Sequence, residues 1–205
     1  MVGQLANVDP KLAERVANGL GLDRAVVPVP TKVQARTDLK PSTPLSILAK
    51  AKPTVKGRMV GCLVADGTDP ALVTALKAHA QSEGAKLKVV APKVQGAKGA
   101  NGQMIPADFQ LAGGPSVLFD AVVIAASATG AQQLAMQTAA VAWVQDAFSH
   151  LKVIGYTASA KPLLDKAGVM PDRGIVAMTG GSNTFLAEAA KGRVWEREPK
   201  VRMVV

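Results

Sequence analysis

The sequence predicts an α/β fold: a three-layer sandwich in which helices cover both faces of a mostly parallel sheet, preceded by an extended N-terminal arm. From Arg58 onward, short apolar runs of strand length alternate with segments that carry helical spacing and helix-capping residues. Aromatic residues make up only 3% of the chain. The core is therefore expected to consist of small aliphatic side chains, which let helices lie close to a sheet.

The arm is expected to begin with a short amphipathic helix over residues 9–20. Asp9 can cap this helix, and Pro10 suits its first turn. Its apolar side chains recur every four residues and form one stripe, Leu12, Val16 and Leu20. Because a helix of this length is marginally stable alone, the stripe needs a partner surface.

Residues 22–57 contain five prolines and are expected to form an extended linker, with one possible helical turn at 44–53. A segment of this kind is typical of a strap that lies on another surface. The sequence therefore predicts two parts, an arm over residues 1–57 and a folded domain over residues 58–205.

The folded domain opens with an apolar run at 58–65, which predicts a buried strand. The helix expected over 69–84 has Asp69 as its cap, Pro70 in its first turn and Gly84 as its end. A second apolar run predicts a strand over 85–92, and the glycine-rich stretch after it, 93–116, predicts a loop or hairpin. The same signals predict the remaining strands at 119–127, 152–156 and 174–178 and the remaining helices at 130–150, 159–168 and 182–192.

The charge and cysteine content limit the classes of function. The net charge is +9, and residues 1–57 carry nine Lys and Arg against four Asp and Glu. Because no aromatic residues are interleaved for base stacking, we expect no nucleic-acid partner. A single cysteine allows no internal disulfide. The N-terminus lacks an apolar signal-peptide run, and no stretch approaches 18 apolar residues, so we expect a cytoplasmic protein without a membrane partner.

The turn after the strand 152–156 is the first candidate for chemistry. Thr157 could be a weak nucleophile beside backbone N–H groups at a helix start. The alternative is that Thr157 and Ser159 cap the following helix, and this is favoured because neither His79 nor His150 is near Thr157 in the sequence. Asp69 also follows a strand, where a carboxylate could act as an acid or a base, but helix capping explains it as well.

Other candidates give weaker signals. Cys62 lies in an apolar strand and is expected to be a core thiol of raised pKa and low reactivity. The run 96–102 has the glycines and lysine of a phosphate loop without the strand and helix that such a loop needs. The run 179–185 could bind an anion at a helix start or could be ordinary capping. No cluster of His, Cys, Asp or Glu has metal-ligand spacing.

The stretch 119–164, "FDAVVIAASATGAQQLAMQTAAVAWVQDAFSHLKVIGYTASAKPLL", resembles the central region of the class I glutamine amidotransferase-like superfamily, which includes PfpI-type proteases and has a flavodoxin-like fold. The resemblance places the family's nucleophilic cysteine on Thr157, the following histidine on Ala158 and the supporting acid on Asp69. It places the oxyanion loop on residues 125–127. The resemblance therefore implies a vestigial pocket bounded by Asp69, Ser127 and Thr157, in which the reactive side chains have been lost.

A second resemblance covers nearly the whole chain. The blocks "LANVDPKLAERVANGLGL", "PLSILAKAKPTVKGRMVGCLVADGTD", "IPADFQLAGGPSVLFDAVVIA" and "AAKGRVWEREPKVRMVV" are similar to the C-terminal part of large-subunit haem catalases. This resemblance implies that residues 1–22 are the last helical piece of a catalase core, 23–57 a linker and 58–205 an appended domain. The family's haem machinery lies upstream, so the resemblance implies no haem or other cofactor in this chain.

These resemblances lead to a functional expectation with two alternatives. The expected function is a non-catalytic accessory domain of a homotetrameric catalase that dismutates hydrogen peroxide, with the catalase core as partner and a role in stability, assembly or chaperone-like binding of unfolded clients. The first alternative is a residual PfpI-type hydrolase or glyoxalase at Thr157. The second is an independent holdase-like module that binds clients through the stripe of residues 12–20.

Overall fold

A computed structural model describes residues 1–22, 25–33, 36, 38–179 and 181–201. The chain divides into two compact units, Met1–Ala51 and Lys52–Val205. The division lies at 51/52, a few residues before the predicted boundary, because residues 52–57 belong to the second unit. Val55 is buried in its core, and the Gly57 N–H donates to the Gly84 carbonyl at 2.9 Å.

The first unit begins with the helices α1 (Val2–Leu5) and α2 (Pro10–Gly19). As predicted, the Asp9 side chain caps α2 and accepts from the Lys11 and Leu12 N–H groups at 2.8 and 3.4 Å. The side chains that α2 buries are Ala13 and Ala17, whereas Leu12 and Leu20 remain exposed. Two short helical segments follow in the linker, η1 (Thr43–Leu45) and α3 (Ile47–Lys50).

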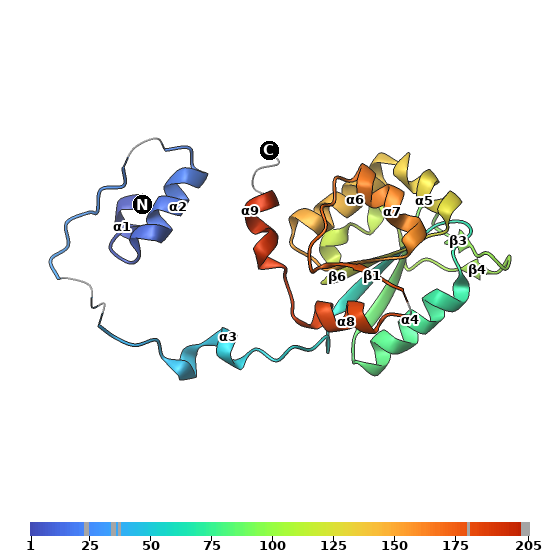
Figure 1. The fold of residues 1–205 in the computed structure, drawn as a ribbon, viewed down its shortest axis with the longest axis horizontal. Helices are drawn as coiled ribbons and strands as arrows, with labels where there is room; N and C mark the ends of the chain where they lie inside the picture. Colours follow the sequence, from blue (N-terminus) through green and yellow to red (C-terminus); the bar gives the residue numbers. More distant parts are fainter. Residues whose placement is uncertain (23–24, 34–35, 37, 180, 202–205) are drawn as a thin grey trace. The chain divides into compact units, whose positions relative to one another are not determined.

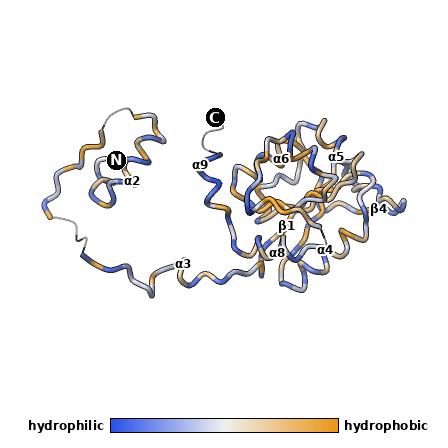
Figure 2. The backbone as a smooth tube through the Cα atoms, viewed as in Figure 1, coloured by the Kyte–Doolittle hydropathy of each residue, from blue (hydrophilic) through white to orange (hydrophobic). Residues whose placement is uncertain are grey.

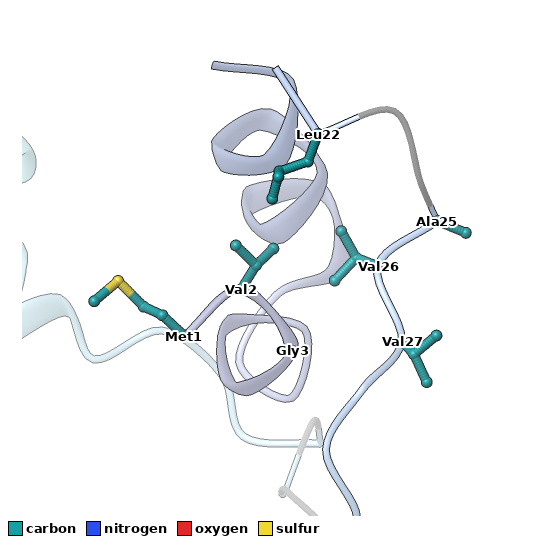
Figure 3. A pocket seen from close by; sticks show the side chains of 7 residues that line it. All are labelled: Met1, Val2, Gly3, Leu22, Ala25, Val26 and Val27. Carbon is teal, nitrogen blue, oxygen red and sulfur yellow. The ribbon is translucent and has the colours of Figure 1, made fainter. Parts of the chain in front are cut away.

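An extended segment lies on α1 within this unit. The Val29 N–H donates to the Gly3 carbonyl at 3.0 Å, and the Asn7 amide donates to the Val29 carbonyl at 2.8 Å. Gly3 permits this close approach, because a Cβ there would lie 2.6 Å from the Val27 carbonyl oxygen. The same segment borders a hollow of about 390 Å³, into which Val2, Leu22 and Val26 point (Figure 3).

The second unit is built on one six-stranded sheet in the order β5-β2-β1-β6-β7-β8. Every neighbouring pair of strands runs parallel. Its strands in chain order are β1 (Met59–Val64), β2 (Lys86–Ala91), β5 (Phe109–Gln110), β6 (Ala121–Ala125), β7 (Ile154–Tyr156) and β8 (Ile175–Ala177). The predicted α/β class and its mostly parallel sheet are therefore confirmed, and the apolar strands form the hydrophobic centre of the unit (Figure 2).

Helices cover both faces of the sheet (Figure 1). On one face, α4 (Pro70–Ser82) and α8 (Asn183–Ala190) pack on alternate side chains of β1 that include Val60, Cys62 and Val64. On the other face lie α5 (Ala128–Ala135), α6 (Thr138–Ser149) and α7 (Lys161–Lys166). Among the described residues, every helix falls short of the length and hydrophobicity that crossing a bilayer requires.

Two glycines in central strands make room for phenylalanine rings on opposite faces. A Cβ on Gly61 in β1 would lie 2.4 Å from the Phe119 ring, and one on Gly155 in β7 would lie 2.7 Å from the Phe185 ring. Both rings are buried. Each face of the sheet thus has one buried phenylalanine ring seated on a glycine of a central strand.

The prediction of a single helix over 130–150 is wrong, because the segment forms two helices, α5 and α6. Gln137 has the extended backbone of an N-cap between α5 and α6. The buried side chains of α5 and those of α6 would point roughly a third of a turn apart on one continuous helix. The break at 136–137 lets both sets face the sheet.

Two other segments add elements that the sequence did not predict. The loop 93–116 contains the expected hairpin, formed by β3 (Ala97–Lys98) and β4 (Met104–Ile105), and it also supplies the edge strand β5. After α8, the chain forms η5 (Trp195–Arg197) and α9 (Glu198–Val201).

Arg197 anchors this last segment to the sheet layer. Its guanidinium is fully buried and binds Asp172 through two hydrogen bonds of 2.6 and 2.9 Å. It also donates to the carbonyls of Phe148 and Lys152 and lies 4.3 Å from the centre of the Phe148 ring. Burial opposes the charge on Asp172, but the bonds from Arg197 outweigh it, and the pKa of Asp172 lies below its ordinary value.

Lys152 is a second buried cation, and its ammonium donates hydrogen bonds to two main-chain carbonyls. It donates to Phe119 O at 2.5 Å and also to Ser116 O. Burial disfavours the charged form, Arg193 adds repulsion, and the pKa of Lys152 falls from 10.5 to about 8. Folding therefore works against protonation at this site.

This arrangement predicts a pH dependence of stability. Between pH 8 and 10.5 the unfolded chain holds a proton on Lys152 that the folded chain has lost, so the free energy of unfolding should rise with pH by up to about 3 kcal/mol from this group. Lys152→Met should flatten that rise in urea denaturation across the interval. The exposed Lys86, changed to Met, is the matched control and should leave the rise in place. Equal slopes in both variants would contradict the assignment.

Candidate functional site

The strand order places the topological switch point between β1 and β6. β1 pairs with β2 on one side and with β6 on the other, and the connections run outward in opposite directions from this pair. In open parallel sheets, ligands bind at the carboxyl ends of the strands that flank such a point. Here those ends lead into residues 65–69 and 126–127.

A buried threonine joins the two strand ends. Thr68 is 1% exposed, and its hydroxyl donates to the Ala125 carbonyl at 2.7 Å. The same oxygen accepts from the Ala65 N–H at 3.1 Å. Since Ala125 ends β6 and Ala65 follows β1, this side chain occupies the place where the crevice would open.

The β3–β4 hairpin lies over the end of β1. The Gly67 N–H donates to the Lys98 carbonyl at 2.7 Å, and the Ala100 N–H donates to the Thr68 carbonyl at 2.9 Å. Asp66 accepts from the Lys98 N–H at 2.8 Å and from the Lys93 ammonium at 2.7 Å. The bond from Lys93 is the main reason that the pKa of Asp66 lies below its ordinary value.

Ser127 ties the end of β6 to this loop. Its hydroxyl accepts from the Gly130 N–H at 3.0 Å, which caps α5, and donates to the Asp66 carbonyl at 3.2 Å. A Cβ on Gly67 would lie 2.7 Å from the Ser127 oxygen, so glycine is required for the close contact of the two loops.

Thr157 and Ser159 tie β7 to the same place. The Thr157 hydroxyl donates to the Ala126 carbonyl at 2.9 Å, and the Ser159 hydroxyl donates to the same carbonyl at 2.9 Å. The predicted capping role of these two side chains is wrong. Thr157 occupies the N-cap position of the following turn, but both hydroxyls bond to the Ala126 carbonyl and neither caps the helix. The helix predicted over 159–168 begins instead as a 3₁₀ turn, η4 (Ala158–Ala160), and continues as α7.

The three proposed pocket residues have different hydrogen-bond partners. The Ser127 hydroxyl donates to the Asp66 carbonyl and the Thr157 hydroxyl to the Ala126 carbonyl. Asp69 is exposed and caps α4 by accepting from the Ala71 N–H at 2.9 Å. The carboxylate that joins the loop after β1 to the β3–β4 hairpin is that of Asp66, which was not among the predicted site residues. Its position directly after the strand end, without a following proline, was the available signal.

The remaining candidates lie elsewhere. Cys62 is fully buried, and burial raises the pKa of its thiol to about 12, as predicted. The glycine-rich run 96–102 forms the hairpin turn, and the run 179–185 includes residue 180, which lies outside the described residues. His150 contacts the Asp146 carbonyl, and His79 contacts Ser182. Within the described ranges, no three His, Cys, Asp or Glu side chains gather as metal ligands.

Comparison with known families gives one match over most of the chain. Residues 56–199 match the family described as the C-terminal domain found in long catalases. This range begins just after the boundary between the two units and ends within α9.

Individual relatives extend the similarity into the first unit. Catalase C of Rhizobium meliloti is 42% identical over 207 residues, which cover 99% of this chain and 29% of that protein. Catalase HPII of Pseudomonas aeruginosa is 30% identical over 203 residues, which cover 98% of this chain and 28% of that protein. The chain thus spans less than a third of the length of these relatives.

The fold resembles that of a solved two-domain protein from Anabaena variabilis with DJ-1/ThiJ/PfpI-like and ferritin-like domains. The TM-score is 0.51 at 18% identity, over 57% of this chain and 35% of that protein. This likeness supports the flavodoxin-like α/β architecture and carries no information on activity.

The hydrogen bonds of Thr157 predict that replacing this residue lowers stability and removes no catalytic activity. Thr157→Val removes one of the two hydroxyl donors to the Ala126 carbonyl and leaves Ser159 as the other, so the free energy of unfolding should fall by about 1 kcal/mol in urea denaturation. Thr74→Val is the matched control, since its exposed hydroxyl bonds only within α4, and it should change stability by less than about 0.5 kcal/mol. A covalent adduct on Thr157 after incubation with an electrophilic substrate analogue would contradict this role.

Proposed function

The chain belongs to the family of C-terminal domains found in long catalases, and we propose that it serves as an accessory domain of a peroxide-dismutating haem catalase. In this role it has no peroxide chemistry of its own and contributes to the stability or assembly of the enzyme. Its partner is a catalase core, in a homotetramer.

One observation supports an accessory role more than any other: the switch-point edge is closed by the chain itself. The hydroxyls of Thr68, Ser127 and Thr157 each bond to backbone groups of a neighbouring loop. The β3–β4 hairpin covers the end of β1 through four further hydrogen bonds that involve residues 66–68, 93, 98 and 100. A hydroxyl that is held in this way, with carbonyls as its acceptors, has no base to activate it.

The proposal also follows from the extent of the similarity. The relatives named as catalases match this chain over 99% and 98% of its length but over only 29% and 28% of their own. In the proposal, the haem and its ligands belong to the part of those proteins that this chain does not match.

A peroxide assay tests the absence of catalase chemistry in this chain. After incubation with haem and removal of the excess, the full chain should release oxygen from hydrogen peroxide no faster than an equal amount of free haem. Oxygen release well above that control, together with a protein-bound haem absorbance band, would refute the proposal.

The exposed apolar residues of the first unit favour a binding function in addition. Val8, Leu20, Leu45 and Ile47 are each more than 60% exposed. In the proposal these side chains contact the catalase core, and in the isolated chain they are free to hold unfolded client proteins through apolar contact.

Light scattering of a heat-aggregating client protein tests client binding. The full chain should reduce aggregation, and a triple variant Leu20→Ser, Leu45→Ser, Ile47→Ser should lose most of that protection. The matched control places serine at Val94 and Met136, which are comparably exposed in the second unit. Equal protection by both variants would assign client binding to another surface, and no protection by the unaltered chain would remove this function.

A further inference from the structure

One serine hydroxyl in the second unit contacts an imidazole. Ser182 precedes α8, His79 lies on α4, and Ser182 Oγ is 2.7 Å from His79 Nδ1. Both side chains are half-buried. The two helices lie on the same face of the sheet, on the side opposite α5, α6 and α7.

A groove adjoins this pair. It has a volume of about 530 Å³, which falls within the range of small-molecule sites. His79 lines the groove, so the imidazole contacts the serine hydroxyl and also borders the open space. The rest of the lining mixes apolar and polar side chains, among them Pro53, Val55, Glu83, Asn183 and Leu186.

The start of α8 leaves donors available beside the serine. Ser182 occupies the N-cap position, yet its side chain makes no capping bond, and its oxygen lies against His79 Nδ1 instead. The N–H groups in the first turn of an α-helix have no partner within the helix, and the helix dipole places partial positive charge there. An oxygen that gains negative charge next to Ser182 would therefore be stabilised.

We propose that Ser182 and His79 form a nucleophile and general-base pair that hydrolyses small carboxylic esters bound in the groove between α4 and α8. A nucleophile within hydrogen-bond distance of a base, beside a hollow and a set of N–H donors, is the arrangement that acyl transfer requires. Thr157 differs from Ser182 because its hydroxyl bonds to a backbone carbonyl and, among the described residues, contacts no imidazole.

Hydrolysis of the ester by this pair needs water as its only co-reactant. His79 Nδ1 takes the hydroxyl proton as Ser182 Oγ bonds to the ester carbonyl carbon, and the alcohol leaves with that proton. Water then attacks the acyl carbon, His79 takes one of its protons, and the bond to Oγ breaks. The carboxylic acid departs, and the proton returns to Ser182.

The test uses the full chain and p-nitrophenyl acetate as the probe, with release of p-nitrophenol as the readout. Ser182→Ala should reduce turnover to the level of the buffer, and His79→Gln should lower it by about 100-fold or more. Ser82→Ala is the matched control, because Ser82 also lies on α4 and its hydroxyl bonds only to the His79 carbonyl. Its turnover and that of Thr157→Val should match the unaltered chain.

Covalent capture gives an independent readout on the unaltered chain. A fluorophosphonate should form an Oγ–phosphorus bond with loss of fluoride and a proton, and mass spectrometry should place the adduct on Ser182. The absence of both turnover and adduct in the unaltered chain would overturn the proposal, whether or not the variants fold. An adduct on another residue, or turnover that Ser182→Ala retains, would also overturn it.

Discussion

The hydrogen bond from the Thr68 hydroxyl to the Ala125 carbonyl is the constraint on which the carboxyl edge of the sheet depends. It joins the loops that follow β1 and β6, the two strands at which an open parallel sheet would form its crevice. Because Thr68 is buried, its hydroxyl needs partners inside the protein, and it finds one on each strand end. Ser127 and Thr157 extend the same principle to the next loops, so polar groups that could face a ligand satisfy the backbone instead.

The opposite edge of the sheet is held by charge rather than by hydroxyl groups. Lys152 and Arg197 are both buried, and both donate to main-chain carbonyls near the amino ends of the strands. Arg197 has Asp172 as its counter-ion, whereas the ammonium of Lys152 donates to the carbonyls of Ser116 and Phe119. The two cations therefore tie the C-terminal segment and the start of β7 to the backbone that precedes β6 and β7.

Most of the sheet could be predicted from local pattern, because each buried parallel strand is an apolar run bounded by turn residues. Local pattern could not show which way a helical face points or which distant segments contact each other. The break at Gln137 depends on where the sheet lies relative to two helical faces, and β5 is too short to have a periodicity of its own. At the site, Asp66 and Asp69 both follow β1, and Pro70 marks Asp69 as the helix cap. The bond of Asp66 to the Lys98 N–H joins residues 32 positions apart, so local pattern could not indicate it. The contact of Ser182 with His79 joins positions 103 residues apart, so no spacing rule could have indicated it.

The hydroxyls of Thr157 and Ser182 differ in the group that each one contacts. A carbonyl oxygen accepts a hydrogen bond from a hydroxyl but does not take its proton, so Thr157 gains order and no reactivity from Ala126. An imidazole nitrogen both accepts the bond and can hold the proton, so the same type of contact gives Ser182 a route to the alkoxide. A hydroxyl without a base at one position of a fold therefore does not exclude chemistry from the rest of it. A domain held by backbone-directed hydroxyls at its switch point can still present a reactive pair between helices on its outer layer.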